Sequence, residues 1–182
     1  MTGRLLGLLG FLVVLVAACG SGSGAQPAAA PAVHSGGSSG AAGTQPRVPA
    51  PLQFTAKTLD GREFSGQSLL GKPAVLWFWA PWCPTCQREA PVVGKVAAAH
   101  PAVAFVGVAA RDQPSAMQQF VDKYQLGAVP QLADTDGVVW EKFGVLAQPA
   151  FAFVNAKGLV DVVEGPLSES ELTRRVTALA PK

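Results

Sequence analysis

Apolar residues are distributed along the chain in runs that are typical of buried strands and of helices. Continuous apolar runs at Pro73–Trp79 and Val103–Ala109 predict two strands that are covered on both faces of a sheet. A helix is predicted after each run, at Pro84–Ala99 and at Pro114–Tyr124, and proline suits the first position of both helices. This alternation predicts strands packed against helices.

Shorter elements are predicted on both sides of this central unit. Pro51–Phe64 has the pattern of a hairpin that turns at Asp60-Gly61, and Ala150–Val154 with Leu159–Glu164 predict a second hairpin. The remaining predicted helices are Ser68–Leu70, Gly137–Phe143 and a last one that begins after Ser168. Together these elements predict an α/β fold, in which helices flank a central mixed β-sheet and an N-terminal β-hairpin forms an extension.

The first 50 residues have the pattern of an export signal followed by a tether. Arg4 precedes an apolar stretch from Leu5 to Val16, which is short for a membrane-spanning helix. Residues 20–50 consist mainly of Gly, Ser, Ala, Pro and Thr, a composition that is typical of a linker with little to bury. The sequence therefore predicts a signal peptide at 1–18, a tether at 19–50 and one folded domain at 51–182.

The end of the signal carries a candidate modification site. Val16-Ala17-Ala18-Cys19 resembles the lipobox of bacterial lipoproteins, in which the cysteine is lipidated and becomes the mature N-terminus. Lipid on Cys19 would anchor the protein to the outer face of the cell membrane, since each buried methylene contributes about 0.8 kcal/mol. The alternative is an ordinary cleaved signal, which would make the protein secreted.

Charge and cysteine content narrow the classes of function. The 182 residues carry a formal net charge of +2, which does not indicate a nucleic acid partner. Besides Cys19, the cysteines are Cys83 and Cys86, and a zinc site would need a second pair of ligands. The two histidines are poor candidates, because His34 lies in the tether and His100 at a helix end. We therefore expect no metal and no cofactor.

Two cysteines stand where the first buried strand passes into a helix, in the motif Trp82-Cys83-Pro84-Thr85-Cys86. Free N–H groups and the helix dipole stabilise an anion there, so we expect Cys83 at the cap position with an exposed thiolate sulfur. Cys86 follows one turn later and is close enough to form a disulfide. That disulfide would close too small a loop to stabilise the fold by much, which favours a redox-active pair.

Two prolines accompany this motif. Pro91 lies inside the helix that carries the cysteines, where it should produce a kink. Gln148-Pro149 precedes an apolar strand, and its peptide bond is a candidate for the cis form. The commoner trans form remains open from the sequence alone.

These motifs resemble the thioredoxin superfamily, specifically its extracytoplasmic DsbE/TlpA-like branch, over nearly all of residues 51–180. The matching segments are Phe54…Leu59-Asp60-Gly61, Gly71-Lys72-Pro73, Trp77-Phe78-Trp79-Ala80-Pro81, the dicysteine motif, Pro91, Asp134-Thr135-Asp136-Gly137, Phe143-Gly144-Val145 and Pro149. The resemblance implies a thioredoxin-like fold in which Cys83 is the nucleophile, Cys86 resolves the mixed disulfide and a cis Pro149 faces the pair.

The supporting residues of the site are expected to bind the substrate. We expect residues around Gln148 to pair with the substrate backbone and Trp82 to contact its side chains. Pro84 and Thr85, between the cysteines, complete the predicted site.

Two positions depart from the family pattern and bear on the direction of electron flow. Trp77 stands six residues before Cys83, where many thioredoxins carry a buried acid, and Ala150 follows Pro149, where reductants of cytochrome c precursors often carry an acid. We therefore expect an oxidase of cysteine-bearing exported proteins, recharged by a membrane redox partner. The alternatives are a TlpA-like reductase for cytochrome c or copper-site assembly, and a non-catalytic binding lipoprotein.

Overall fold

Strand β3 (Ala74–Trp79) lies at the centre of a five-stranded sheet, because all six of its side chains are apolar and all are buried. β4 (Ala104–Ala109) runs parallel to it on one side, and β6 (Ala150–Val154) runs antiparallel on the other. The edge strands are β5 (Gln131–Ala133) and β7 (Val160–Glu164), which give the order β5-β4-β3-β6-β7. The predicted mixed sheet is confirmed.

The structure is a computed structural model, and it describes residues 48–179. The predicted signal peptide, the lipidation site at Cys19 and the tether up to residue 47 lie outside these residues. Within residues 48–179, no helix has both the length and the apolar composition that crossing a membrane requires.

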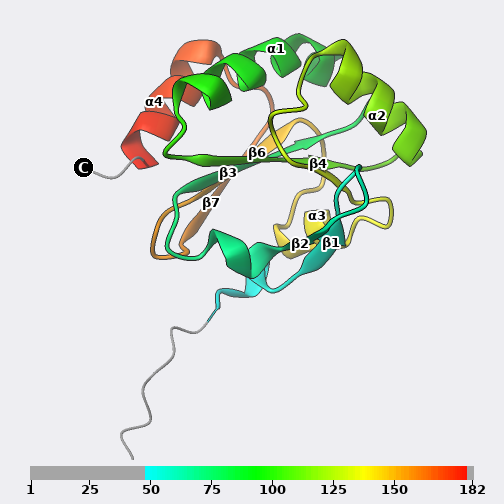
Figure 1. Ribbon diagram of the computed structural model, residues 1–182. Coiled ribbons are helices and arrows are strands. Elements are labelled where there is room, and N and C mark those ends of the chain that lie inside the picture. The colour runs from blue at the N-terminus through cyan, green and yellow to red at the C-terminus, as the bar shows by residue number, and fades with distance from the viewer. Residues whose placement is uncertain (1–47, 180–182) are drawn as a thin grey trace, which may run out of the picture. The chain divides into compact units, whose positions relative to one another are not determined.

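Helices cover both faces of the sheet, as Figure 1 shows. Three of them pack on one face, namely α1 (Pro84–Ala99), α2 (Pro114–Lys123) and α4 (Glu169–Leu179). Trp77 and Trp79 point to this face, and Phe120 of α2 stacks on Trp79 with ring centroids 4.2 Å apart. Because side chains alternate along a strand, Leu76 and Phe78 point to the opposite face.

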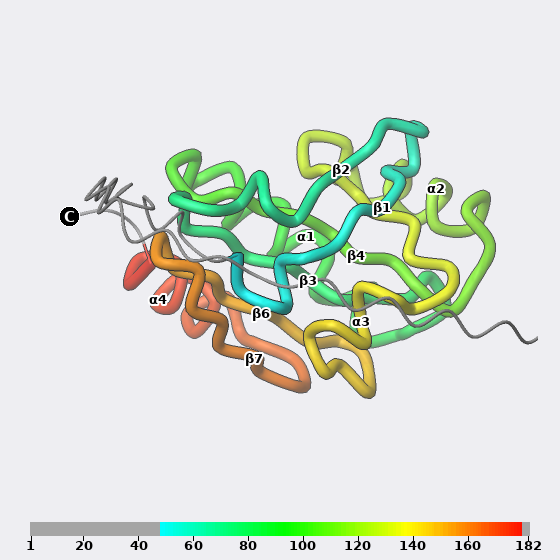
Figure 2. Tube along the Cα trace, turned by 90° about the horizontal axis from the view of Figure 1, so that it is seen from below, coloured from blue at the N-terminus to red at the C-terminus, as the bar shows by residue number. Residues whose placement is uncertain are grey.

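The opposite face is covered by α3 and by the N-terminal extension, both of which lie in front of the sheet in Figure 2. These elements are α3 (Val138–Lys142), β1 (Thr55–Lys57), β2 (Glu63–Ser65) and the 3₁₀ turns η1 (Ala50–Leu52) and η2 (Gly66–Leu69). β1 and β2 pair in antiparallel fashion around the turn that contains Gly61, whose φ is 83°. The predicted β-hairpin extension is therefore confirmed.

Strand β5 is not predicted by the sequence pattern. This strand has only three residues and pairs within the sheet with β4 alone, so its position depends on a neighbour that is distant in the sequence. Its first residue, Gln131, is polar yet buried, and it accepts a hydrogen bond from the indole of Trp79 (3.1 Å). A short edge strand with a buried polar side chain lacks the periodicity that predicts strands.

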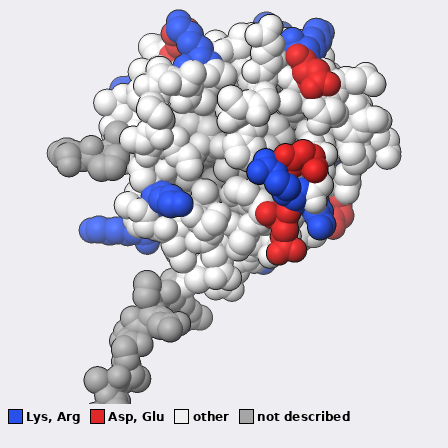
Figure 3. Space-filling model, in the orientation of Figure 1, with Lys and Arg blue, Asp and Glu red and all other residues white. Residues whose placement is uncertain are grey.

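On the face shown in Figure 3, several acidic side chains lie beside basic ones, a few basic side chains stand alone, and broad uncharged areas separate them. Ion pairs between exposed groups include Arg62 with Asp60 (2.8 Å) and Lys95 with Glu169 (2.6 Å). This face therefore presents no extended basic surface of the kind that binds nucleic acid.

Candidate active site

Cys83 is the N-cap residue of α1, directly after the turn that leaves β3. Its Sγ accepts a hydrogen bond from the backbone N–H of Cys86 (3.2 Å), so the sulfur occupies a position where the N-terminus of the helix stabilises negative charge. Pro84 is the first residue of α1. Both cysteines are free thiols in this structure, one helical turn apart.

The two thiols are more buried than the sequence predicts. Cys83 is only 5% exposed, where an exposed sulfur was expected, and Cys86 is fully buried. The backbone N–H of Cys83 bonds to the carbonyl of Ala80 (3.2 Å), which folds the residue back toward the end of β3 and into the apolar cluster around Trp77. Burial, reinforced by the interaction with Cys83, raises the pKa of the Cys86 thiol well above its usual range.

A buried carboxyl group lies on the same helix as the cysteines. Glu89 follows Cys86 by three residues, is 6% exposed, and accepts hydrogen bonds from the Trp77 indole (3.2 Å) and from the backbone N–H of Leu167 (2.7 Å). Burial raises the pKa of Glu89 to about 7, although these hydrogen bonds and the charge of Arg88 oppose the shift. The site therefore contains an acid that titrates near neutral pH.

Glu89 is a buried acid that the sequence analysis did not identify. Trp77 stands at the position where many thioredoxins carry a buried acid, and its indole donates a hydrogen bond to the carboxyl group of Glu89. A signal was available in the sequence, because Cys86, Ala90 and Val93 form the buried stripe of α1 and Glu89 falls on it. A charged residue on a buried helical stripe is rare unless it has partners or a function.

This carboxyl group leads to a prediction about folding stability. The pKa of Glu89 lies near 4.5 in the unfolded chain and near 7 in the folded protein, so the folded state binds more protons between these values. The free energy of unfolding should therefore fall as pH rises through this window. We expect it to fall by about 3 kcal/mol more in the wild type than in Glu89→Gln.

Urea denaturation of both proteins at pH 4.5 and pH 8 measures this difference. The glutamine loses one of the two hydrogen bonds at either pH, so the informative quantity is the change with pH rather than the absolute stability. Burial also raises the pKa of Asp134, but both proteins contain that residue and its contribution cancels. Parallel pH profiles for the two proteins would contradict the assignment.

The first residue of β6 pairs with the end of β3, Ala150 with Phe78, so Pro149 lies at the end of the sheet where the chain leaves β3 toward the dicysteine motif. The Gln148-Pro149 peptide bond is cis, and Pro149 is buried directly before β6. Trp82, beside Cys83, is 52% exposed. The hydroxyl of Thr85 accepts a hydrogen bond from Arg88 (3.0 Å).

Gln148 has an unsatisfied acceptor. Its side-chain Oε1 is buried, and no donor reaches it among the described residues. A buried acceptor without a partner costs free energy. This oxygen is therefore a candidate to receive a hydrogen bond from a bound chain.

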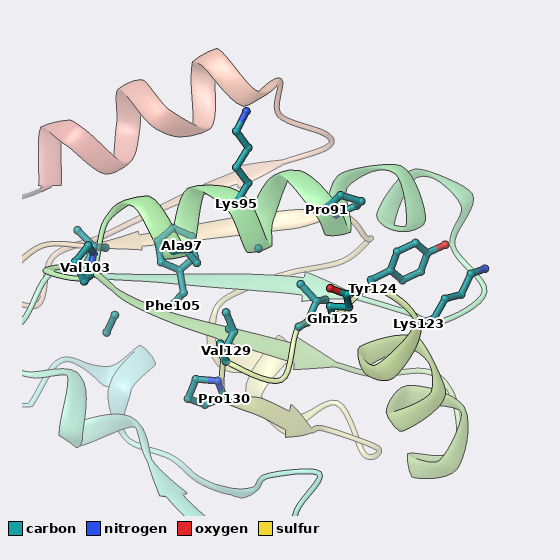
Figure 4. Close-up of a pocket in the computed structure, with 16 residues that line it drawn as sticks. Pro91, Lys95, Ala97, Val103, Phe105, Lys123, Tyr124, Gln125, Val129 and Pro130 are labelled. Carbon is teal, nitrogen blue, oxygen red and sulfur yellow. The ribbon is translucent and has the colours of Figure 1, made fainter.

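A cavity of about 820 Å³ lies away from the sulfurs. Figure 4 shows it beneath α1, between the C-terminal end of α2 and the edge of the sheet. Its lining includes Phe105, Tyr124 and Val129 but neither cysteine. Lysines at its rim are already engaged, Lys95 with Glu169 and Lys123 over the ring of Tyr124.

Several known proteins are similar to this chain in sequence or in fold. The AhpC/TSA family matches residues 46–163. The chain is 70% identical to MTB DsbF, whose structure holds mixed oxidised and reduced forms, over 74% of this chain and all of that one, with a TM-score of 0.73. It is 55% identical to the soluble secreted antigen MPT53 of Mycobacterium tuberculosis, over 70% of this chain and 75% of that protein. The thiol:disulfide interchange protein DsbE of Pseudomonas fluorescens is 32% identical, over 69% and 73%.

Proposed function

Because the chain belongs to the AhpC/TSA family of thioredoxin-like proteins, we propose that it is a thiol–disulfide oxidoreductase of the DsbE/DsbF type that acts through Cys83 and Cys86. The observation that carries the proposal is the position of both thiols at the start of α1, where Sγ of Cys83 accepts a hydrogen bond from the backbone N–H of Cys86. In thiol–disulfide exchange the thiolate is both the nucleophile and the leaving group, and the N-terminus of a helix stabilises that form.

The exchange proceeds in two balanced steps. A client thiolate attacks Sγ of Cys83 in the oxidised pair, the Cys83–Cys86 bond breaks, and Cys86 leaves as a thiolate. The client's second thiol loses its proton and attacks the client sulfur of the mixed disulfide. This releases an oxidised client and the Cys83 thiolate, so two electrons pass from the client to the enzyme.

Glu89 handles the proton at Cys86. The leaving thiolate forms in a fully buried position where its charge is disfavoured, and the raised pKa of the Cys86 thiol favours its protonation. Glu89, buried one turn further along α1 with a pKa near 7, donates that proton and takes it back when the pair is reoxidised.

The client chain binds beside Cys83. The buried Oε1 of Gln148 accepts a client N–H, and the exposed ring of Trp82 contacts client side chains. Pro149, Pro84 and Thr85 shape the surface around the pair. The clients are proteins that carry cysteines.

We propose oxidation of client thiols as the working direction. Two observations support it: Ala150 follows Pro149 where an acid is found in dedicated reductants, and the first turn of α1 contains no acidic residue. The reduced pair contains the hydrogen bond from the backbone N–H of Cys86 to Sγ of Cys83, and an interaction that stabilises the reduced form makes the disulfide a stronger oxidant. Reduction of client disulfides is the second candidate. Glu89 favours it, because this residue supplies a buried acid although Trp77 occupies the position where many thioredoxins carry one.

The clients are exported proteins. The export signal predicted at residues 1–18 supports this compartment, and the 55% identical MPT53 is a secreted protein. Lipid on Cys19 would hold the enzyme at the outer face of the membrane, where a membrane redox partner recharges the pair.

The redox potential of the pair tests the direction. We expect equilibration with glutathione buffers to give a potential between about −120 and −200 mV, the range of known oxidants and isomerases. A value near or below about −250 mV would exclude the oxidase and support the reductase. A pair that reacts with neither dithiothreitol nor glutathione would indicate a non-catalytic binding protein.

A further inference from the structure

Arg111 follows β4 in an uncommon backbone conformation. Its φ is 63°, in the left-handed region, where a side chain is unfavourable and glycine or asparagine is usual. Gln125 is the other non-glycine residue with positive φ in the described part of the chain. Because β3 and β4 are parallel, Arg111 emerges at the same end of the sheet as the dicysteine motif.

The residue joins two loops that are distant in the sequence. Its carbonyl oxygen accepts a hydrogen bond from the indole of Trp82 (3.0 Å), and its Nη2 donates to the carbonyl of Leu146 (2.6 Å). The guanidinium lies 4.9 Å from the ring centroid of Trp140, a distance at which a cation is attracted to an aromatic face. Trp140 is itself fixed, since its indole donates to the carbonyl of Val108 (3.2 Å).

Trp82 and Leu146 are also the two large apolar side chains left exposed next to the site. Trp82 is 52% exposed and directly precedes Cys83, and Leu146 is 77% exposed, three residues before Pro149. Arg111 is the residue that bonds to both of these segments. A surface held in place before binding loses less conformational entropy when the client arrives.

We propose that Arg111 is a positioning residue, which holds the Trp82 segment and the Leu146 segment in the relative arrangement that a client chain binds. The inference rests on the proposed function, since it concerns the affinity of the same site for its client. Arg111 does not touch the sulfurs, so it acts on binding and not on the exchange step.

Arg111→Gly removes the side-chain contacts and leaves the backbone contact in place. Glycine readily adopts the same φ, and it keeps the carbonyl oxygen that accepts the hydrogen bond from the Trp82 indole. With a synthetic dithiol peptide as the client, we expect KM to rise about three- to tenfold while kcat stays within about twofold. The equilibrium constant with glutathione should also stay within about twofold. Arg111→Lys, which keeps a donor for Leu146, should recover part of the loss.

Gln125→Gly is the matched control, because it makes the same backbone change at an exposed position that bonds to neither segment. Quenching by acrylamide, which is uncharged, gives a second measurement, since Trp82 is the one exposed tryptophan of the four. Quenching should increase in Arg111→Gly and not in Gln125→Gly.

The outcomes separate the inference from the function it rests on. A wild-type KM in Arg111→Gly overturns the inference alone, as does an equal effect in Gln125→Gly. A changed glutathione equilibrium in Arg111→Gly overturns it too, because the residue would then act on the sulfurs. A wild-type protein that exchanges with no client overturns the proposed function and this inference together.

Discussion

We expect Cys83→Ser to abolish exchange, with a loss of at least about a thousandfold, and Cys86→Ser to capture clients as stable mixed disulfides. Cys83 is the thiol with residual exposure and the helix cap, so it is the sulfur that a client reaches. Without it, the buried Cys86 has no access to the client. Insulin reduction or the oxidation of a dithiol peptide measures the loss.

Cys86→Ser should trap clients because it lacks the thiol that resolves the mixed disulfide. In Cys86→Ser, the Cys83 thiolate attacks an oxidised client, the client's disulfide breaks, and one client thiolate leaves. A hydroxyl cannot then displace the client sulfur, so the mixed disulfide accumulates and is visible on a non-reducing gel. Near-ultraviolet circular dichroism checks that both variants are folded. Full activity in Cys83→Ser would refute the assignment of the nucleophile.

Glu89→Gln slows the resolution of a mixed disulfide by Cys86 about 100-fold or more at pH 8. Cys86 must lose its proton before it attacks, and its raised pKa makes the thiolate scarce without a base beside it. Glu89 is ionised above its pKa of about 7 and then accepts the proton. Below pH 6 the carboxyl is protonated, so the wild type and the variant should converge.

Single-turnover kinetics of the reduced protein with a disulfide peptide, from pH 5 to pH 9, measure this step. The wild-type rate should rise through pH 7, and the variant should lack that rise. Glu141→Gln is the matched control, because Glu141 is an exposed glutamate of α3 on the opposite face of the sheet. A variant that keeps the wild-type profile would mean that another group, or water, takes the proton.

Much of the fold was predictable because its signals are local. The apolar run of β3 reflects a strand buried on both faces, and Pro84 marks the first residue of α1 as predicted. The hairpin of β6 and β7 likewise has its turn and its apolar residues within one short segment. β5 was not predictable in this way, because its three residues become a strand only when β4 lies beside them.

The site, like the fold, has features that depend on local sequence and features that depend on contacts between distant residues. The sequence by itself determined the pair Cys83 and Cys86, their place at the start of a helix and the candidate Pro149, because spacing and residue type carry that information. Only the tertiary structure decided how deeply the pair is buried and that an acid of the same helix is buried as well. Glu89 acquires its raised pKa from burial and from partners as distant as Leu167. Arg111 joins Trp82 to Leu146 across gaps of 29 and 35 residues, and such contacts exist only once the chain has folded.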